Sequence, residues 1–313
     1  MVISADMTIL MYRGKMKKYN YYFDITDILI HVQIPFEIII QNESENFNSN
    51  IKDEDISIKF LEINEPINVN GSIIYKDIFN IYSVDEKFIY EFYPSPGMNP
   101  YAWLIPIDDL NYEVRYLKGK ENYIKYSKNI MEIIDIVKIM NKNNAFMLHS
   151  SFIKYNNKAI LFSAPSGTGK STQADLWNKY ENAEIINGDR AGIRKIGDEW
   201  TAYGLPFAGS SRIFKNKKAH ISHIIILRQG KENKLKRLSP REAFIKIYSE
   251  TTIHTWDKEF QENIINMITD LVQNVPVYLY ECLPNEDAVK FLKQKIEEDN
   301  NRGILNEAEI SRA

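Results

Sequence analysis

KAILFSAPSGTGKSTQADLW, residues 158–177, is the stretch that decides the fold of this chain. Its apolar residues 160–162 predict a short buried strand, the small residues of 164–169 predict a loop, and the residues from Thr172 onward predict a helix. A strand, a glycine-containing loop ending in Gly-Lys-Ser, and a helix form the expected context of a phosphate-binding P-loop. The stretch therefore predicts an α/β domain that binds a nucleoside triphosphate.

The residue types in this loop suit phosphate chemistry. Gly167 and Gly169 allow the backbone to approach the phosphates closely, and the helix that follows presents free N–H groups to an anion. Lys170 is expected to reach the β- and γ-phosphates and Ser171 to bind Mg²⁺.

The loop departs from the motif at one position. Ala164 stands where the motif has glycine, and alanine is tolerable there if its φ is negative. An ordinary glycine-rich turn before a helix is the alternative. The predicted nucleotide-binding residues are Ser166, Gly167, Thr168, Gly169, Lys170, Ser171 and Thr172.

Composition narrows the class of protein. The chain has 313 residues, 44% of them hydrophobic, and a formal net charge of −3. This balance argues against a nucleic-acid binder. The one cysteine, Cys282, suits a reducing compartment. No signal peptide or membrane-spanning segment is evident, so we expect a cytoplasmic protein.

The patterning predicts two domains and a tail. Residues 1–120 are expected to form a mostly β domain that could bind substrate or a partner, because period-two alternation recurs at 30–40, 56–60, 88–92 and 114–116. The turn signals between these runs predict that the strands pair in an antiparallel sheet. Residues 121–142 have the period of one amphipathic helix that leads into a P-loop domain of residues 121–300. Residues 301–313 are expected to be a polar, frayed tail.

Strands and helices alternate in the second domain. Strands are predicted at 146–153, 159–162, 184–186, 193–196, 200–203, 221–227 and 277–281. Helices are predicted at 172–179, 240–248, 260–272 and 287–296, with Ser239 as N-cap and Pro240 as first helical residue.

Asp189 is the expected acid of the site. It follows the short apolar strand at 184–186, and a carboxylate at the end of the strand after the P-loop helix would lie beside the phosphates. We expect a catalytic or metal-binding role, although Asn-Gly-Asp could also be a simple turn. Asp189 to Gly192 matches the short D-x-x-G pattern of GTP-binding switch proteins, but no Asn-Lys-x-Asp element follows, so we exclude a small GTPase.

Two further residues are candidates for catalysis. His149 lies in FMLHSSF, a predicted strand next to the P-loop strand, and is either catalytic or structural. Arg212 lies in the Gly/Ser-rich loop 203–218, which carries four cations. This loop is either a solvated loop or a mobile lid that brings Arg212 or a lysine to the transferring phosphoryl group.

Taken together, these motifs resemble the HPr kinase/phosphorylase-like branch of the phosphoenolpyruvate carboxykinase superfamily, and especially the stand-alone kinases encoded with peptide natural-product genes. The matching segments, in order, are LHS at 148–150, APSGTGKST at 164–172, INGDR at 186–190, GLPFAGSS at 204–211 and VPVYLYECLPNEDAVKFL at 275–292. The resemblance covers roughly residues 145–295 and implies a P-loop domain with a mixed sheet. It places phosphate and Mg²⁺ at Lys170 and Ser171, His149 beside the reaction centre and Asp189 as a site acid.

The implied activity is transfer of the γ-phosphoryl group from ATP to a hydroxyl, namely a serine of a peptide or small protein. A small-molecule hydroxyl kinase and a nucleotide-binding regulatory protein without transfer activity are alternatives. Family members pair two aspartates where this chain has Gly188-Asp189, so Asp189 would serve alone or with His149. The resemblance also implies that the protein could form a homo-oligomer. From the charge balance and the lack of a long apolar run, we expect neither a nucleic-acid nor a membrane partner.

Overall fold

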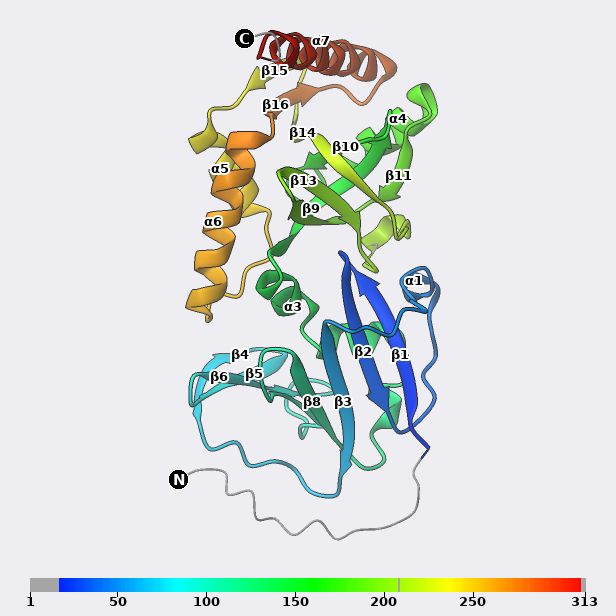
Figure 1. Ribbon diagram of the computed structural model, residues 1–313, viewed down its shortest axis with the longest axis vertical. Helices are drawn as coiled ribbons and strands as arrows, with labels where there is room; N and C mark the ends of the chain where they lie inside the picture. Colours follow the sequence, from blue (N-terminus) through cyan, green and yellow to red (C-terminus); the bar gives the residue numbers. More distant parts are fainter. Residues whose placement is uncertain (1–16, 208, 311–313) are drawn as a thin grey trace.

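The computed structural model describes residues 17–207 and 209–310. They form a mixed α/β structure with two eight-stranded mixed sheets, one from each half of the chain. Figure 1 shows the first sheet below the second, with helix α3 (Ile136–Lys142) between them.

The first sheet has the strand order β1-β2-β3-β8-β7-β6-β5-β4. Its strands are β1 (Tyr19–Ile25), β2 (Ile28–Ile34), β3 (Ile56–Ile63), β4 (Ser72–Lys76), β5 (Phe79–Val84), β6 (Lys87–Phe92), β7 (Ala102–Pro106) and β8 (Asn111–Leu117), with a short helix α1 (Asn42–Glu45) after β2. The mostly β character of this region is as expected. The expectation of an antiparallel sheet is wrong for β2–β3 and β3–β8, which pair in parallel. The strand predicted at 30–40 ends at Ile34, because Pro35 has no N–H to continue the ladder.

The second sheet contains a closed ring. Its strands are β9 (Ala145–Tyr155), β10 (Lys158–Ser163), β11 (Glu184–Asn187), β12 (Arg190–Ile196), β13 (Glu199–Gly204), β14 (Lys218–Gln229), β15 (Lys234–Arg237) and β16 (Val277–Cys282). β10 pairs with β9 on one side and with β14 on the other, and the pairings β9–β12–β13–β14 complete the ring. All seven strands predicted in this part of the chain are present. β15 is too polar for any apolar pattern to predict it.

The single helix predicted at 121–142 is wrong. The segment forms a 3₁₀ turn η1 (Glu121–Tyr123), helix α2 (Ser127–Ile133) and helix α3. Asp135 breaks the helix with a φ of 52°, and its side chain accepts the N–H of Lys138 as the N-cap of α3. Ile133, Ile134 and Ile136, on either side of this break, are all at most 3% exposed and pack into the core of the first sheet.

The remaining helices enclose the second sheet. They are α4 (Lys170–Glu181), α5 (Pro240–Ser249), α6 (Lys258–Asn274) and α7 (Glu286–Ile310), with a 3₁₀ turn η2 (Gly209–Ser211). The predicted start of α5 is confirmed, because Ser239 and Glu242 form a capping box before Pro240. Helix α7 continues to Ile310, where we expected a frayed tail from 301, because Leu, Glu and Ala favour a helix there. Residues 311–313 lie outside the described residues.

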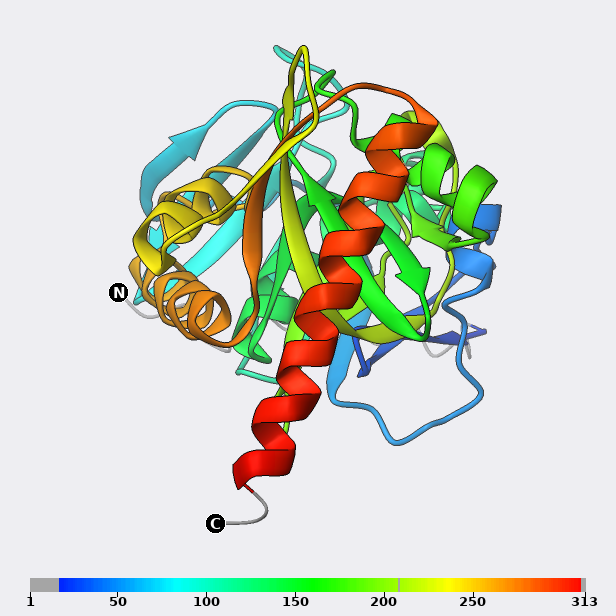
Figure 2. The ribbon, with the colours of Figure 1, turned by 90° about the horizontal axis from the view of Figure 1, so that it is seen from above.

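Each face of the second sheet has its own core. Helices α4 and α7 pack on one face around Trp177, Phe162 and Leu292, whereas α5 and α6 pack on the other around Phe260 and Ile264. Figure 2 shows α7 and the α5–α6 pair on different sides of these strands. The apolar side chains of α2 and α3 pack instead into the core of the first sheet. The domain boundary near 120 stays a prediction. Among the described residues, no helix is long and apolar enough to cross a membrane.

Candidate functional site

The 164–169 segment, called here the glycine loop, follows β10 and leads directly into α4. The predicted order of strand, loop and helix is therefore confirmed. Gly167 and Gly169 have φ angles of 79° and 115°, in the left-handed region that favours glycine. Ala164 is 1% exposed and does not adopt a positive φ, so its methyl group is accommodated. The loop ends at the N-terminus of α4, where free N–H groups and the helix dipole favour an anion.

Lys170 is the first residue of α4 and folds back over the glycine loop. Its Nζ donates to the carbonyl oxygens of Ala164 at 2.8 Å and of Pro165 at 3.3 Å. The residue is only 6% exposed, and this burial lowers the pKa of the ammonium against the opposing charges of Glu250 and Asp189. An anion on the loop would give the ammonium a charged partner, which makes a stronger hydrogen bond than a carbonyl group does.

Asp189 lies where β11 ends and β12 begins, beside the middle of β9. Asn187 fixes this junction from a fully buried position. Its Oδ1 accepts the N–H of Asp189 at 2.9 Å and of Arg190 at 3.0 Å, and its Nδ2 donates to the carbonyl oxygens of Leu205 and Phe207, both at 2.9 Å. In the sequence, Asn187 stands out only as part of a turn signal, although a buried asparagine can bind several backbone groups at once.

His149 lies on β9 between two carboxylates. Its Nδ1 is 3.1 Å from Oε2 of Glu250, and its Nε2 is 3.6 Å from Oδ1 of Asp189. The nearby imidazole of His149 lowers the pKa of Asp189, helped by Arg190, whose Nε lies 3.3 Å from Oδ2, whereas burial acts in the opposite direction. Asp189 is therefore ionised at neutral pH. Sequence reasoning missed Glu250, because it follows α5 at a distance of 101 positions from His149 and no motif contains it.

Gly188, just before Asp189, has no space for a side chain. A Cβ there would lie 2.2 Å from Oγ and 2.4 Å from Cβ of Ser211. A Cβ on Gly209 would likewise lie 2.7 Å from Cγ of Asp189. The η2 turn therefore packs directly against the Gly188-Asp189 pair, and Ser211 occupies the space that a side chain at position 188 would need.

Arg212 follows η2 with a φ of 52° and is exposed. No acidic side chain in the described part of the chain pairs with it. Two lysines of the same loop are directed to the opposite end of β11, where Lys215 and Lys217 pair with Glu184 at 2.8 and 2.7 Å. The structure thus places these two lysines away from Asp189, and a lid role for Arg212 stays a prediction.

One cavity of about 350 Å³, called here the loop cavity, brings most of the predicted site together. Its lining residues are His149, Ser166, Gly167, Gly169, Lys170, Ser171, Thr172, Gly188 and Asp189. Thr168 lines an adjoining cavity of about 440 Å³ that shares Gly167, Gly169 and Thr172 and continues to Gln229 and Cys282. Of the predicted site residues, Arg212 lines neither cavity.

Ser171 and Asp189 are the predicted metal ligands. Within the described residues no group of three or more His, Cys, Asp or Glu side chains could hold a metal by itself. Mg²⁺ on a nucleotide needs only one or two protein oxygens, because water and phosphate oxygens complete its shell. The Ser171 hydroxyl lies 3.4 Å from the carbonyl oxygen of Gly188, next to Asp189, and both ligands line the loop cavity. A hydroxyl and an ionised carboxylate fit such an ion.

The comparisons with known proteins give weak similarities. No protein-family model matches the chain. The chain is 27% identical over 189 residues to dynein heavy chain-like protein 2 of Plasmodium falciparum, covering 58% of this chain and spanning 3% of that protein's length. Among solved structures it is similar to the Hpr(Ser) kinase/phosphatase from Coxiella burnetii, with a TM-score of 0.29 and 11% identity, over 51% of this chain and 97% of that one. These values establish neither a family nor an activity.

Proposed function

We propose that this protein is a kinase that uses ATP and Mg²⁺ to phosphorylate a hydroxyl, namely a serine of a peptide or small protein. One observation carries the proposal. The glycine loop, Lys170 and Ser171 share a cavity of about 350 Å³ with His149 from β9 and Asp189 from the β11–β12 junction. A phosphate-binding loop, a cation, a hydroxyl and an ionised acid are the groups that phosphoryl transfer needs, because it depends mainly on positioning and charge neutralisation.

Each residue has a defined part in this proposal. The glycine loop and Lys170 bind the phosphates, and Ser171 with Asp189 would hold Mg²⁺, which supplies further neutralisation of the phosphate charge when bound. Glu250 holds Nδ1 of His149, which leaves Nε2 directed at Asp189. An acceptor hydroxyl near this pair would give its proton to Asp189 or to Nε2 of His149.

Phosphoryl transfer from γ-labelled ATP to candidate serine peptides tests the proposal. We expect Lys170→Ala and Asp189→Asn each to lower the transfer rate by at least about a hundredfold. Lys179→Ala is the matched control, because Lys179 lies in the last turn of the same helix, bonds to the hydroxyl of Tyr180 and lines neither the loop cavity nor the adjoining cavity. Unchanged transfer in Lys170→Ala, with the control equally active, would refute the proposal.

A nucleotide-binding regulatory protein without transfer activity is the second candidate. It is favoured by Gly188, because Ser211 fills the space where a second acid would stand. Tight ATP binding that Lys170→Ala abolishes, with no transfer to any acceptor and no effect of Asp189→Asn, would favour this candidate over a kinase.

A further inference from the structure

A cavity of about 560 Å³, called here the junction cavity, lies between the two halves of the molecule. Its walls come from β5 and β6 of the first sheet, from η1, α2 and α3, and from Met147, Arg190 and Phe207 of the second half. Its volume falls within the usual range for small-molecule sites.

Strand β9 connects the junction cavity to the loop cavity. Side chains alternate between the two faces of a strand. Ala145 and Met147 pack into the core of the first sheet, whereas Phe146 and Leu148 pack into the core of the second. His149 is the next residue on the face of Met147. Met147, which lines the junction cavity, and His149, which lines the loop cavity, are therefore successive residues on the same face of β9.

Two further contacts join the junction cavity to Asp189. Arg190 lines the cavity, and its guanidinium lies between Oδ2 of Asp189, 3.3 Å from Nε, and Sδ of Met147, 3.3 Å from Nη1. Phe207 also lines the cavity, and its carbonyl oxygen accepts the Nδ2 hydrogen of Asn187, which also binds the backbone of Asp189. The end of the junction cavity is therefore built from the residues that hold the candidate acid.

The lining of the junction cavity is mainly aromatic and aliphatic, with Phe79, Phe92, Tyr123, Val137, Met147 and Phe207 among its residues. We propose that the junction cavity binds the acceptor, and that the acceptor is a hydroxyl compound whose neighbouring groups are aromatic or aliphatic. The inference rests on the proposed kinase function. An apolar body in the cavity would direct its hydroxyl past Arg190 toward Asp189 and His149.

In the phosphoryl transfer, the acceptor oxygen bonds to the γ-phosphorus of ATP, and the bond from that phosphorus to the bridging oxygen breaks. ADP leaves, and the hydroxyl proton goes to Asp189 or His149.

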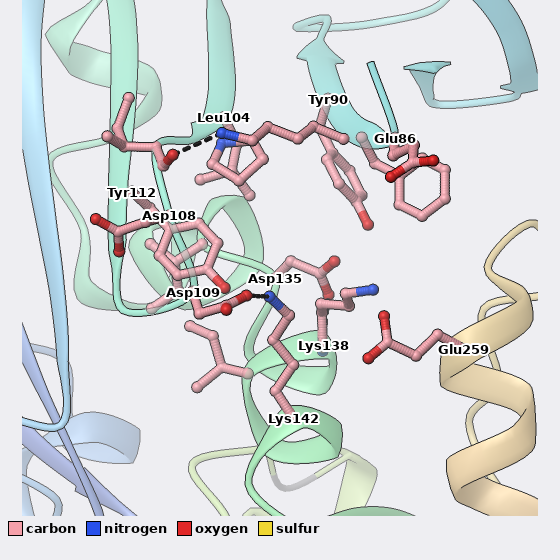
Figure 3. A pocket seen from close by; sticks show the side chains of 16 residues that line it. Glu86, Tyr90, Leu104, Asp108, Asp109, Tyr112, Asp135, Lys138, Lys142 and Glu259 are labelled. Atoms are coloured by element: carbon pink, nitrogen blue, oxygen red, sulfur yellow. Dashed lines mark hydrogen bonds and ion pairs between the residues drawn. The ribbon is translucent and has the colours of Figure 1, made fainter. Parts of the chain in front are cut away.

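Another cavity, of about 370 Å³ and with many charged residues in its lining, does not fit this role. Figure 3 shows it lined by Asp109, Asp135, Lys138 and Lys142, with Lys142 bonded to Asp109 at 2.7 Å. Lys138 is likewise paired with Asp257. Among the described residues, none of its lining side chains hydrogen-bonds or ion-pairs with the glycine loop or Asp189. Its charges join the first sheet to α3 and α6.

Three probes test the acceptor site: acetyl-Phe-Ser-Phe-amide, acetyl-Glu-Ser-Glu-amide and 3-phenylpropan-1-ol, each with labelled ATP. We expect transfer to the aromatic peptide or to the alcohol, and a kcat/KM at least about tenfold lower for the glutamate peptide. The peptide and the alcohol distinguish a peptide source of the acceptor from a small-molecule one. Equal transfer to the two peptides would overturn the inference.

Tyr123→Ala probes the far wall of the cavity, and Tyr126→Ala is its matched control, because Tyr126 lies three residues away and does not line the cavity. We expect Tyr123→Ala to raise KM for the preferred probe by about tenfold and to leave KM for ATP unchanged. No change in Tyr123→Ala would overturn the inference.

Calorimetric titration separates failure of the cavity from failure of the kinase proposal. Binding of the aromatic peptide that is lost in Tyr123→Ala, without transfer to any probe, would support the junction cavity and contradict the kinase function. Absence of both transfer and binding for the aromatic probes would overturn the junction cavity as the acceptor site.

Discussion

Because Ser211 packs against Gly188, a side chain introduced at position 188 should destabilise the fold. In Gly188→Ala, the new Cβ would lie 2.2 Å from Oγ and 2.4 Å from Cβ of Ser211, so η2 must move away from Asp189. Gly188 has no positive φ, and the cost is therefore steric. Overpacking of this kind typically costs about 1–3 kcal/mol of unfolding free energy. We expect Gly188→Ala to lose this amount in urea denaturation followed by tryptophan fluorescence.

Two variants of Ser211 identify the clashing atoms. Ser211→Gly removes both Oγ and Cβ, so the double variant with Gly188→Ala should recover most of the loss, with a coupling energy of at least about 1 kcal/mol. Ser211→Ala keeps the Cβ at 2.4 Å and should recover much less. If the effects of Gly188→Ala and Ser211→Gly simply add, the reasoning about this contact is wrong.

Three further predictions concern buried or half-buried polar groups. Tyr116→Phe should lower the unfolding free energy by less than about 0.5 kcal/mol or raise it, because the buried Tyr116 hydroxyl has no hydrogen-bond partner among the described residues. Tyr280→Phe should cost about 1 kcal/mol, because the Tyr280 hydroxyl donates to the carbonyl oxygen of Ala288 at 2.8 Å, and denaturation curves of both variants test the difference. Burial raises the pKa of Cys282 to about 11, so iodoacetamide at pH 8 should modify it about a hundredfold more slowly than a free cysteine, as mass spectrometry would show. Burial lowers the pKa of His223 from 6.5 to about 4, so the unfolded chain binds a proton at a higher pH than the folded protein does. The unfolding free energy should therefore fall by up to about 3 kcal/mol as the pH is lowered from 6.5 to 4, and a His223→Gln variant with the same pH dependence would contradict this.

The second half of the fold could be predicted because its signals are local. Each predicted strand is a short apolar run bounded by turn residues, and the glycine loop fixes the order of strand and helix around Lys170. Most of the loop cavity follows from this, because the glycine loop and Asp189 both follow strands that pair with β9. Ser163, before the loop, pairs with Ser150 on β9, next to His149.

The rest of the site depends on contacts between distant segments. Glu250 meets His149 only because α5 ends beside β9, and the backbone N–H of His149 donates to the carbonyl oxygen of Glu250 at 2.9 Å. The reason for glycine at 188 lies in Ser211, 23 positions later. The break at Asp135, between α2 and α3, likewise leaves no mark on the helical periodicity of residues 121–142. No periodicity in the sequence records these choices, because tertiary packing decides them.

The register of strand β9 is fixed because its two faces pack into different cores. Its odd-numbered side chains from Ala145 to His149 face the first core and the candidate site, whereas Phe146 and Leu148 face the second core. A shift of one residue in its pairing with β12 would exchange these faces, so that His149 would leave Glu250 and Asp189 while a large apolar residue replaced it. Both cores oppose such a shift, because Met147, Phe146 and Leu148 are each at most 2% exposed. The packing that holds the two halves together therefore also fixes the distance between His149 and Asp189.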